Sequence, residues 1–338
     1  MEKNIKNTNL NSNVKEDTRE TFALMFTLYN LSENYKVLYK KDPNYTIPKR
    51  LINLYYKKIH PNYNDMIYSF KRKYITNEAL VEKNDSKEQR QGLTLVYDYI
   101  QNYKEKDEEF NIFMITMKIN MLLWGPRDEK FAEDLTKERE ELERLLAEAK
   151  QEKDLAKYKL ARDKISEINN RTSQVKIGGQ LRRESNEVQF QSVNFLVPSG
   201  QEACRFMNSF LNQDKKEEFK KYYNDEDIIE YIKYCIRTTT DLIKYQPFYD
   251  GNKRTFRSLL NLMFKERNLP PVYVKTSESA AYKEALFKAI RENDYNLLYG
   301  FYLFKICDSI YELDVEPYTK KAEKEKTITE ENKKPSFN

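Results

Sequence analysis

Glycine, proline, cysteine and long apolar runs are all scarce in this 338-residue chain. There are 7 Gly and 10 Pro, whereas Lys, Glu and Leu are plentiful, so we expect a mostly helical protein. The three cysteines, Cys204, Cys235 and Cys307, lie far apart and lack metal-ligand spacing. They are typical of reduced residues in a cytosolic protein. No run approaches the apolar length that a membrane span needs.

A strong excess of one charge is also missing. The chain has 59 Lys and Arg against 54 Asp and Glu, a net charge of +5, and the two signs are interspersed. This balance gives no reason to expect nucleic-acid binding. The first 20 residues are polar and contain no apolar signal-peptide core. We therefore expect a cytoplasmic protein that binds neither nucleic acid nor membrane, although export without a cleaved signal fits the same features.

Apolar residues recur at helical spacing along most of the chain. Helices are expected at residues 21–35, 50–59, 65–74, 91–103, 110–124, 200–211, 219–223, 228–245, 255–267, 279–292 and 294–313. Residues 175–197 instead alternate between apolar and polar, which predicts a short β-hairpin. The polar segments 1–18 and 314–338 are predicted to be disordered.

Residues 128–170 form a highly charged segment within this pattern. Leucine and alanine recur in it at seven-residue spacing, at Leu135, Leu142, Ala149 and Ala156. Such spacing predicts a protruding helix or a helical hairpin. The segment fits either an arm that docks a partner or a solvated insertion stabilised by its own ion pairs.

One stretch concentrates the chemistry of the whole chain. It reads Tyr245-Gln246-Pro247-Phe248-Tyr249-Asp250-Gly251-Asn252-Lys253-Arg254-Thr255-Phe256-Arg257. A glycine in so glycine-poor a chain indicates a special backbone conformation between Asp250 and Asn252. We expect a turn whose amides bind an anion at the start of a helix, because free amides and the helix dipole favour negative charge there.

The charged side chains of this stretch favour a polyphosphate as the anion. Arg254 and Arg257 are three residues apart on one helical face, and Lys253 adds a third cation. Asp250 is a carboxylate beside the anion site, where Mg²⁺ would bridge it to phosphates. The stretch therefore predicts a Mg-nucleotide site; a generic cationic helix terminus is the simpler alternative.

The stretch resembles the signature of the Fic domain family, His-Pro-Phe-x-(Asp/Glu)-Gly-Asn-Gly-Arg-x-x-Arg. Two neighbouring segments, residues 178–183 and 195–211, resemble the family segments around its β-hairpin flap. The resemblance implies an all-α Fic/Fido helical core with a short β-hairpin flap and a charged helical insertion. It divides the chain into a disordered N-terminus (1–18), an N-terminal helical region (19–109), the Fic/Fido domain with its insertion (110–313) and a disordered tail (314–338).

The resemblance also implies an activity and roles for particular residues. Most family members transfer AMP from ATP to a hydroxyl side chain of a target protein. By this resemblance Asp250 would bind Mg²⁺, and Gly251, Asn252 and Lys253 would surround the α- and β-phosphates. Arg254 and Arg257 would bind the β- and γ-phosphates. The flap, about Glu187–Phe195, would pair with the target as an added strand.

The chain departs from the family signature at two positions. Gln246 replaces the catalytic histidine, and an amide cannot accept the proton of the target hydroxyl. The chain is thus expected to bind ATP but to transfer AMP poorly, or to be a non-catalytic nucleotide- or partner-binding protein. The only histidine, His60, is a conceivable substitute base but more simply a structural residue.

Lys253 replaces the usual glycine, which is the second departure. Asn-Lys-Arg-Thr resembles the Doc toxin branch, whose members phosphorylate their targets, so a Doc-like kinase is a further alternative. That branch generally lacks the last arginine, and Arg257 therefore favours AMP transfer.

Many Fic proteins carry an inhibitory glutamate that pairs with the second arginine of the signature. Residues 76–84 stand where such a segment is expected, but their spacing does not match the family's inhibitory motif. Glu82 or Glu78 can still be expected to reach Arg257. An ordinary helix terminus is the alternative.

Overall fold

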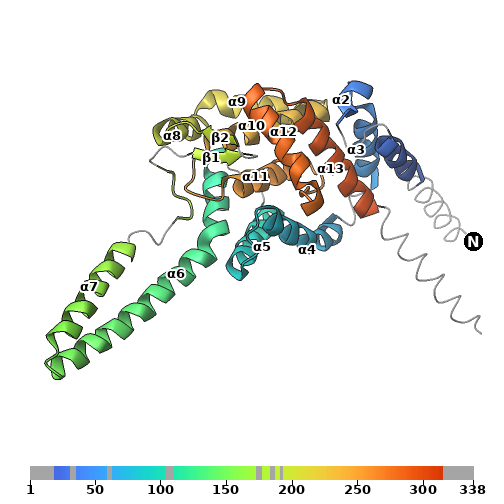
Figure 1. The fold of residues 1–338 in the computed structure, drawn as a ribbon. Helices are drawn as coiled ribbons and strands as arrows, with labels where there is room; N and C mark the ends of the chain where they lie inside the picture. The colour runs from blue at the N-terminus through green and yellow to red at the C-terminus, as the bar shows by residue number, and fades with distance from the viewer. Residues whose placement is uncertain are drawn as a thin grey trace, which may run out of the picture. The chain divides into compact units, whose positions relative to one another are not determined.

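The computed structural model describes residues 19–30, 36–58, 63–103, 110–172, 177–182, 187–190 and 193–314. This part of the chain is mostly helical, as the composition predicts (Figure 1). None of its helices has an apolar stretch long enough to cross a bilayer. His60 and the termini predicted to be disordered lie outside the described residues.

Helices follow one another along most of the described chain. After a helix at residues 19–30 come α2 (Leu38–Lys41), α3 (Thr46–Lys58), α4 (Tyr63–Val81), α5 (Lys87–Asn102), α6 (Ile112–Gln151) and α7 (Leu155–Thr172). They are followed by α8 (Gly200–Ser209), α9 (Gln213–Tyr223), α10 (Ile228–Tyr245), α11 (Asn252–Glu266), the 3-10 turn η2 (Thr276–Glu278), α12 (Ser279–Glu292) and α13 (Asn296–Asp314).

Two short strands lie in the segment that alternates between apolar and polar residues. They are β1 (Glu187–Phe190) and β2 (Val193–Leu196), and they pair antiparallel with Glu187 opposite Leu196. Outside this pair, Leu181 forms an isolated antiparallel bridge with Phe248. The bridge joins the segment before β1 to the Pro-Phe part of the signature.

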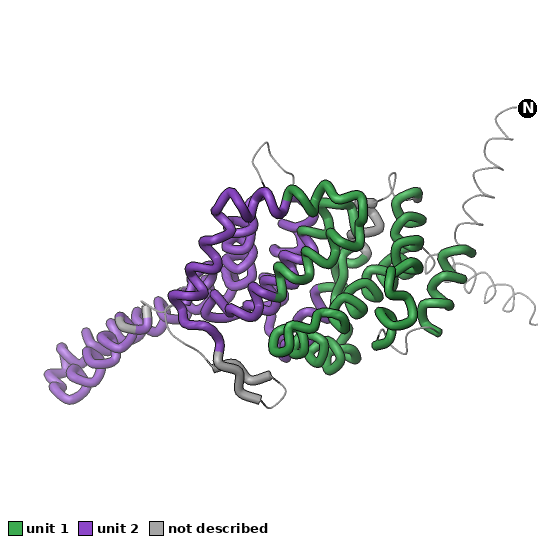
Figure 2. The backbone as a smooth tube through the Cα atoms, turned by 90° about the horizontal axis from the view of Figure 1, so that it is seen from above, with its two compact units in different colours: residues 1–74, 220–240, 263–338 green, residues 75–219, 241–262 purple. Residues whose placement is uncertain are grey.

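Figure 2 colours the chain by its two compact units. The first contains residues 1–74, 220–240 and 263–338, and the second contains residues 75–219 and 241–262. Both units are assembled from separate stretches, whereas the domain boundaries predicted from the sequence follow chain order. The whole 246–257 signature lies in the second unit.

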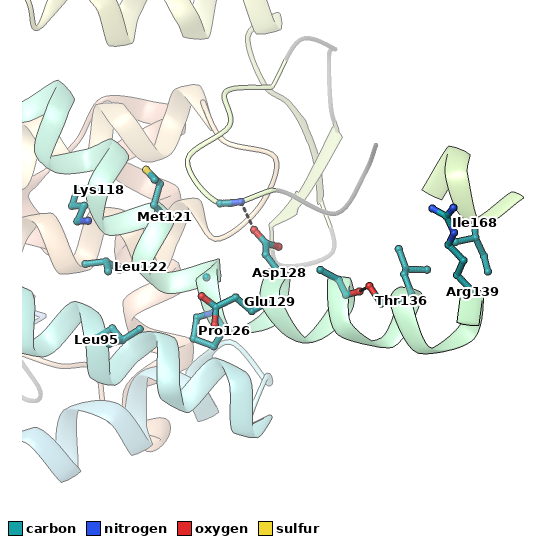
Figure 3. A pocket seen from close by; sticks show the side chains of 14 residues that line it. Leu95, Lys118, Met121, Leu122, Pro126, Asp128, Glu129, Thr136, Arg139 and Ile168 are labelled. Atoms are coloured by element: carbon teal, nitrogen blue, oxygen red, sulfur yellow. Dashed lines mark hydrogen bonds between the residues drawn. The ribbon is translucent and has the colours of Figure 1, made fainter. Parts of the chain in front are cut away.

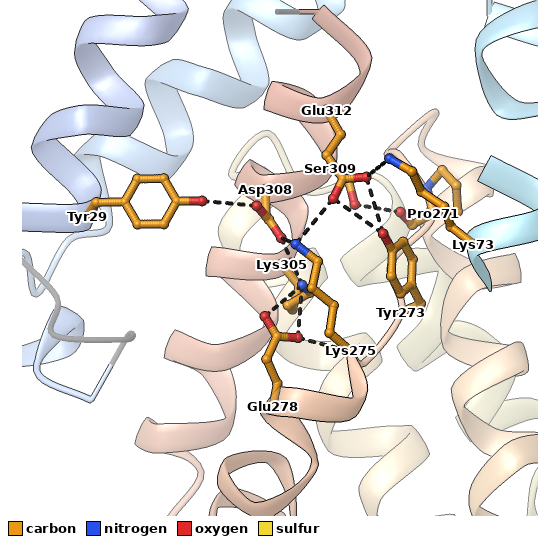
Figure 4. A network of polar contacts seen from close by, with 10 residues as sticks. All are labelled: Tyr29, Lys73, Pro271, Tyr273, Lys275, Glu278, Lys305, Asp308, Ser309 and Glu312. Atoms are coloured by element: carbon orange, nitrogen blue, oxygen red, sulfur yellow. Dashed lines mark hydrogen bonds and ion pairs between the residues drawn. The ribbon is translucent and has the colours of Figure 1, made fainter. Parts of the chain in front are cut away.

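A buried polar network characterises the first unit (Figure 4). Lys305, whose side chain is 2% exposed, pairs with Asp308 at 2.9 Å and with Glu278 at 3.0 Å. Lys275 also reaches Asp308, at 2.8 Å, and Tyr29 donates a hydrogen bond to the same carboxylate. Burial opposes the charge on Asp308, but Lys305 and Lys275 outweigh it and lower its pKa. The network ties the helix of residues 19–30 to α13.

We expect Lys305→Met to destabilise the first unit. The change leaves Glu278 without this cation, and it removes one of the two lysines that bind Asp308. Losing hydrogen bonds to charged groups at a buried position should lower the free energy of unfolding by about 2 kcal/mol. Denaturant unfolding measures this. Lys288→Met, at a side chain 39% exposed, is the control and should change little.

The second unit contains a long helix that the sequence did not predict as one piece. Residues 110–124 and the charged segment were expected to be separate, yet α6 runs through Gly125 and Pro126 without interruption. A proline inside a helix costs one backbone hydrogen bond, here to the carbonyl of Leu122. The helix continues because its apolar first half packs on α5 and its second half packs on α7.

The charged segment is a helical hairpin made of the second half of α6 and α7, which we call the arm (residues 128–172). Its apolar core consists of Leu135, Leu142 and Ile168, with Phe131, Leu145 and Ile165 packed against it. The seven-residue spacing predicts burial correctly for Leu135, Leu142 and Ala149, but Ala156 is exposed. The turn at residues 152–154 ends α6, so the register does not carry over into α7.

Candidate functional site

The signature forms the connection between α10 and α11. Gln246 follows the last residue of α10 with φ 46°, and Gly251 has φ 76°, so the chain turns sharply at both ends of the connection. The helix α11 starts at Asn252, three residues earlier than the sequence pattern predicts. The amides of Asn252, Lys253 and Arg254 therefore belong to a first helical turn, where backbone N–H groups have no partner within the helix.

Asn252 and Asp250 shape this connection through hydrogen bonds to its own backbone. The Asn252 side chain accepts from the Phe248 amide at 2.8 Å and donates to the Phe248 carbonyl at 2.9 Å. The Asp250 carboxylate accepts from the Gly251 amide at 2.5 Å, and its side chain is 62% exposed. The result is a closed loop that holds an exposed carboxylate next to the N-terminus of α11.

Two residues of α6 bind the backbone of the loop at Asp250. Asn120 and Trp124 both donate to the backbone carbonyl of Asp250, each at 3.2 Å. A Cβ atom on Gly251 would lie 2.6 Å from the Trp124 indole nitrogen. Glycine is thus required here for two reasons, the positive φ and the close approach of this indole.

Arg182 binds the backbone at the start of the loop. It is fully buried, its amide donates to the Pro247 carbonyl at 2.8 Å, and its guanidinium donates to the carbonyls of Tyr245, Gln246 and Pro198. These contacts satisfy carbonyls that the end of α10 leaves without a helical partner. The segment before the strands therefore helps to fix the position of Gln246.

The sequence of this region matches a known family model. Residues 159–264, which run from α7 into α11 and include the whole loop, match the model described as Fic/DOC family. By this match, residues 159–264 are similar to the Fic/DOC family.

Solved structures with similarity to this chain carry the same family name. A fragment of Fic-1 from C. elegans is 15% identical with a TM-score of 0.47, covering 90% of this chain and 72% of that one. A Fic domain-containing signaling protein from Bacteroides thetaiotaomicron is 17% identical with a TM-score of 0.46, at 79% and 95% coverage. A Fic family protein from Desulfovibrio desulfuricans is 12% identical with a TM-score of 0.41, at 88% and 73% coverage.

The first arginine of the Fic/DOC signature, Arg254, is held by two neighbours. Its guanidinium donates to the Gln89 side-chain oxygen and lies 5.1 Å from the centre of the Trp124 ring. Burial lowers its pKa, although the nearby Asp250 favours its charged form. The Nε2 atom of Gln89 is buried and has no hydrogen-bond partner among the described residues. An anion drawn to Arg254 would supply an acceptor for this atom.

The second arginine, Arg257, is enclosed by two glutamates. Its Nε atom donates to Glu78 at 2.8 Å and its Nη1 atom donates to Glu82 at 2.8 Å. Glu82 also pairs with Lys253 at 3.1 Å. The side chains of Arg257, Glu78 and Glu82 are 3%, 1% and 14% exposed. Glu78 belongs to the last turn of α4, so this helix terminus closes over the cations of α11.

The charge on Glu82 should be retained far into the acid range. Burial alone would raise its pKa, but Arg257 and Lys253 together lower it to about 2. Since the pKa is lowered in the folded protein, the ion pair stabilises the fold above the ordinary value of 4.5 and loses this effect as the pH falls towards 2.

We therefore expect the stability advantage of the wild type over Glu82→Gln to be constant from pH 8 to pH 5. Below pH 4.5 the advantage should shrink, because Glu82 then binds a proton in the unfolded chain while it stays ionised in the folded protein. Denaturant unfolding of both proteins across this pH range measures it. An advantage that already disappears between pH 7 and pH 5 would contradict the low pKa.

Gln246 occupies the position of the signature histidine, and its side chain is turned back towards α10. It is 8% exposed, and its amide nitrogen donates to the Ile243 carbonyl at 2.8 Å. In this arrangement the side chain completes the end of α10. It offers no group that could accept a proton near neutral pH.

The structure brings together every residue that the signature singles out, and it adds three that the sequence did not indicate. Gln246, Asp250, Gly251, Asn252, Lys253, Arg254 and Arg257 all lie between the end of α10 and the second turn of α11. The residues not foreseen are Gln89, Asn120 and Trp124. A polar Asn120 and the only tryptophan within the apolar run 110–124 were the available signals.

Proposed function

We propose that this Fic/DOC domain binds Mg-ATP at the start of α11 and transfers AMP to a hydroxyl side chain of a target protein. As the chain stands, Gln246 makes the transfer slow. The observation that carries the proposal is the start of α11, whose first two turns bring backbone amides, Lys253, Arg254 and Arg257 together beside an exposed carboxylate. Such a combination suits a polyphosphate and its counter-ion.

The residues present fit a magnesium ion that arrives with the nucleotide. Among the described residues no cluster of three or more His, Cys, Asp or Glu side chains could hold a metal alone. Mg²⁺ commonly binds through one or two carboxylates, several waters and phosphate oxygens. Asp250 supplies one exposed carboxylate next to the proposed phosphate position, and the ion would neutralise phosphate charge there.

The proposed partner is a protein that brings a Ser, Thr or Tyr hydroxyl to the loop. The strands β1 and β2 follow Arg182 in the chain, and Arg182 binds the backbone of the loop. We propose that a segment of the target adds a strand to this pair. Main-chain hydrogen bonds would then position the target hydroxyl and would depend little on the side chains around it. We place the protein in the cytoplasm, where ATP and such targets are available.

A non-catalytic nucleotide-binding protein is the second candidate. The specific observation that favours it is the side chain of Gln246, which bonds to the Ile243 carbonyl and has no proton-accepting group. Both candidates predict the same ATP binding. They differ in what happens once a base is restored at position 246.

The binding test compares Mg-ATP titrations of the wild type, Asp250→Ala and Tyr249→Ala by calorimetry. We expect Asp250→Ala to abolish the Mg²⁺ dependence of binding. Tyr249, 45% exposed in the same loop, is the matched control and should bind as the wild type does. If neither the wild type nor Glu82→Gln, which lacks the competing carboxylate, bound Mg-ATP, the proposal would be overturned.

The reaction test uses ATP labelled separately at the α- and γ-phosphates with the Gln246→His protein and a cell extract. AMP transfer attaches only the α-label to protein. Transfer of only the γ-label would identify a Doc-like kinase instead, which the Asn-Lys-Arg-Thr sequence at 252–255 would explain. Binding without attachment of either label would favour the non-catalytic protein.

A further inference from the structure

One face of α6 contacts both the segment before β1 and the loop of residues 246–251, which we call the nucleotide loop. Asn120, Trp124 and Asp128 are spaced by four residues, so they lie on one side of the helix. Each of the three side chains bonds to backbone outside α6. The helix then continues into the arm, whose base is at Asp128.

Asn120 joins three parts of the second unit. Its oxygen accepts from the Gly179 amide at 2.8 Å, and its nitrogen donates to Thr255 Oγ1 at 2.9 Å and to the Asp250 carbonyl at 3.2 Å. It is fully buried. One side chain therefore fixes the segment 177–182, the nucleotide loop and the first turns of α11 relative to one another.

Asp128 fixes the same segment from the base of the arm (Figure 3). Its Oδ2 atom accepts from the amides of Ile177 and Gly178 at 3.1 and 3.0 Å, and Oδ1 accepts from Arg127 at 3.0 Å. The residue is 7% exposed. Hydrogen bonds from amides to a buried carboxylate are stronger than those between neutral groups, so this is a firm attachment.

The attachment at Asp128 continues into the nucleotide loop through Arg182. Four residues after Gly178, the Arg182 amide bonds to the Pro247 carbonyl and its guanidinium bonds to the carbonyls of Gln246 and Tyr245. The hydrogen bonds at Asp128, the backbone of the segment 177–182 and the hydrogen bonds of Arg182 thus connect the arm to the loop that holds Asp250.

The junction between the arm and the rest of α6 has room for movement. A cavity of about 730 Å³ borders it and is lined by Leu95, Met121, Leu122, Pro126, Leu135 and Ile168, among others (Figure 3). A Cβ atom on Gly125 would meet nothing within 4 Å in the described part of the chain. Helices bend most readily at proline, where one backbone hydrogen bond is missing. The arm can therefore change its angle at Gly125-Pro126 without a clash on this side.

We propose that Asp128 is a positioning residue that couples the helical arm to the nucleotide loop. A change in the seating of the arm moves the segment 177–182, and Arg182 passes this movement to the carbonyls beside Asp250. The arm thereby regulates how tightly Mg-ATP binds. The regulatory part rests on the proposed function, whereas the mechanical coupling does not.

The test measures two quantities on the full chain, hydrogen exchange without nucleotide and the Kd for Mg-ATP. Asp128→Ala should speed exchange in peptides covering both 177–182 and 247–252, and should raise the Kd about tenfold, as expected for lost hydrogen bonds to a charged group. Asp128→Asn keeps an oxygen acceptor and should restore both quantities to within about twofold. Glu129→Ala, the exposed neighbour, removes the same charge and should change neither.

A second pair of variants acts from within the arm and does not touch Asp128. Leu142→Asp disrupts the arm core, and we expect it to speed exchange at 247–252 as Asp128→Ala does. Leu155→Asp, at a side chain 83% exposed in the same hairpin, is its control and should have no effect.

The outcomes separate the coupling from the proposed function. Faster exchange that stays confined to residues 177–178 in Asp128→Ala, or an equal response to Glu129→Ala, would overturn the coupling. Faster exchange at 247–252 in a protein that binds no Mg-ATP in any variant would leave the coupling standing and would refute the nucleotide site. Normal exchange at 247–252 in Leu142→Asp would exclude control by the arm.

Discussion

Gln246→His should raise the rate of AMP attachment to target protein by about 10²–10⁴, the usual contribution of a positioned general base. The imidazole would accept the proton of the target hydroxyl as the hydroxyl oxygen attacks the α-phosphate and pyrophosphate leaves. The measurement is the initial rate of α-label incorporation into protein from ATP, with the variant and the wild type at equal concentration.

The geometry at position 246 suits a histidine. The residue has φ 46°, and histidine is among the non-glycine residues that adopt this left-handed region most often. Gln246→Asn is the matched control, because asparagine tolerates the same φ but supplies no base, and it should remain as slow as the wild type. Equal rates for the histidine and asparagine variants would show that position 246 does not limit the transfer.

Glu82→Gln should tighten Mg-ATP binding by roughly 10- to 100-fold, within the usual range of coupling free energies in proteins. Glu82 now binds Arg257 and Lys253, two of the cations proposed to hold the phosphates. A neutral side chain competes with a phosphate far less than a carboxylate does. Adding Glu78→Gln should tighten binding further, because Glu78 also pairs with Arg257. Calorimetric titration of both variants measures the change.

A nearby carboxylate provides the control for this second prediction. Asp85 lies in the connection between α4 and α5 and pairs with Arg90, but its side chain is 41% exposed. Asp85→Asn should leave the Kd for Mg-ATP unchanged, since exposed ion pairs are screened by solvent. If Asp85→Asn and Glu82→Gln tightened binding equally, the effect would come from net charge and the cluster around Arg257 would not be its cause.

Much of the fold could be predicted from the spacing of apolar residues. The helical class, the helix that ends at Tyr245 and the two C-terminal helices follow directly from their periodic patterns. The long α6 could not be predicted, because Gly125-Pro126 looks like the end of a helix when only neighbours in sequence are considered. Packing on α5 and α7 compensates for the hydrogen bond that Pro126 cannot make.

The candidate site was predictable as far as it depends on one continuous stretch. A special backbone conformation at Gly251 and a helix after it were expected, and the structure has a positive φ at Gly251 and α11 from Asn252. Glu82 or Glu78 was expected to reach Arg257, and the structure has both there. Gln89 and Asn120 come from distant segments, and polar residues of these types occur throughout the chain. Their importance depends on burial and on the partner each one meets, which no pattern of neighbours encodes.

The sequence by itself determined the chemistry offered at the loop: three cations, one carboxylate, a glycine for the turn, and an amide at the position of the base. Only the tertiary structure decided the state in which this chemistry is held. Folding pairs Arg257 with Glu78 and Glu82 and brings Gln89 into contact with Arg254. It also lets Asn120 and Trp124 donate hydrogen bonds to the Asp250 carbonyl. The physical reason is that a buried charge must find partners wherever the packed chain places them, and these partners are far away in sequence.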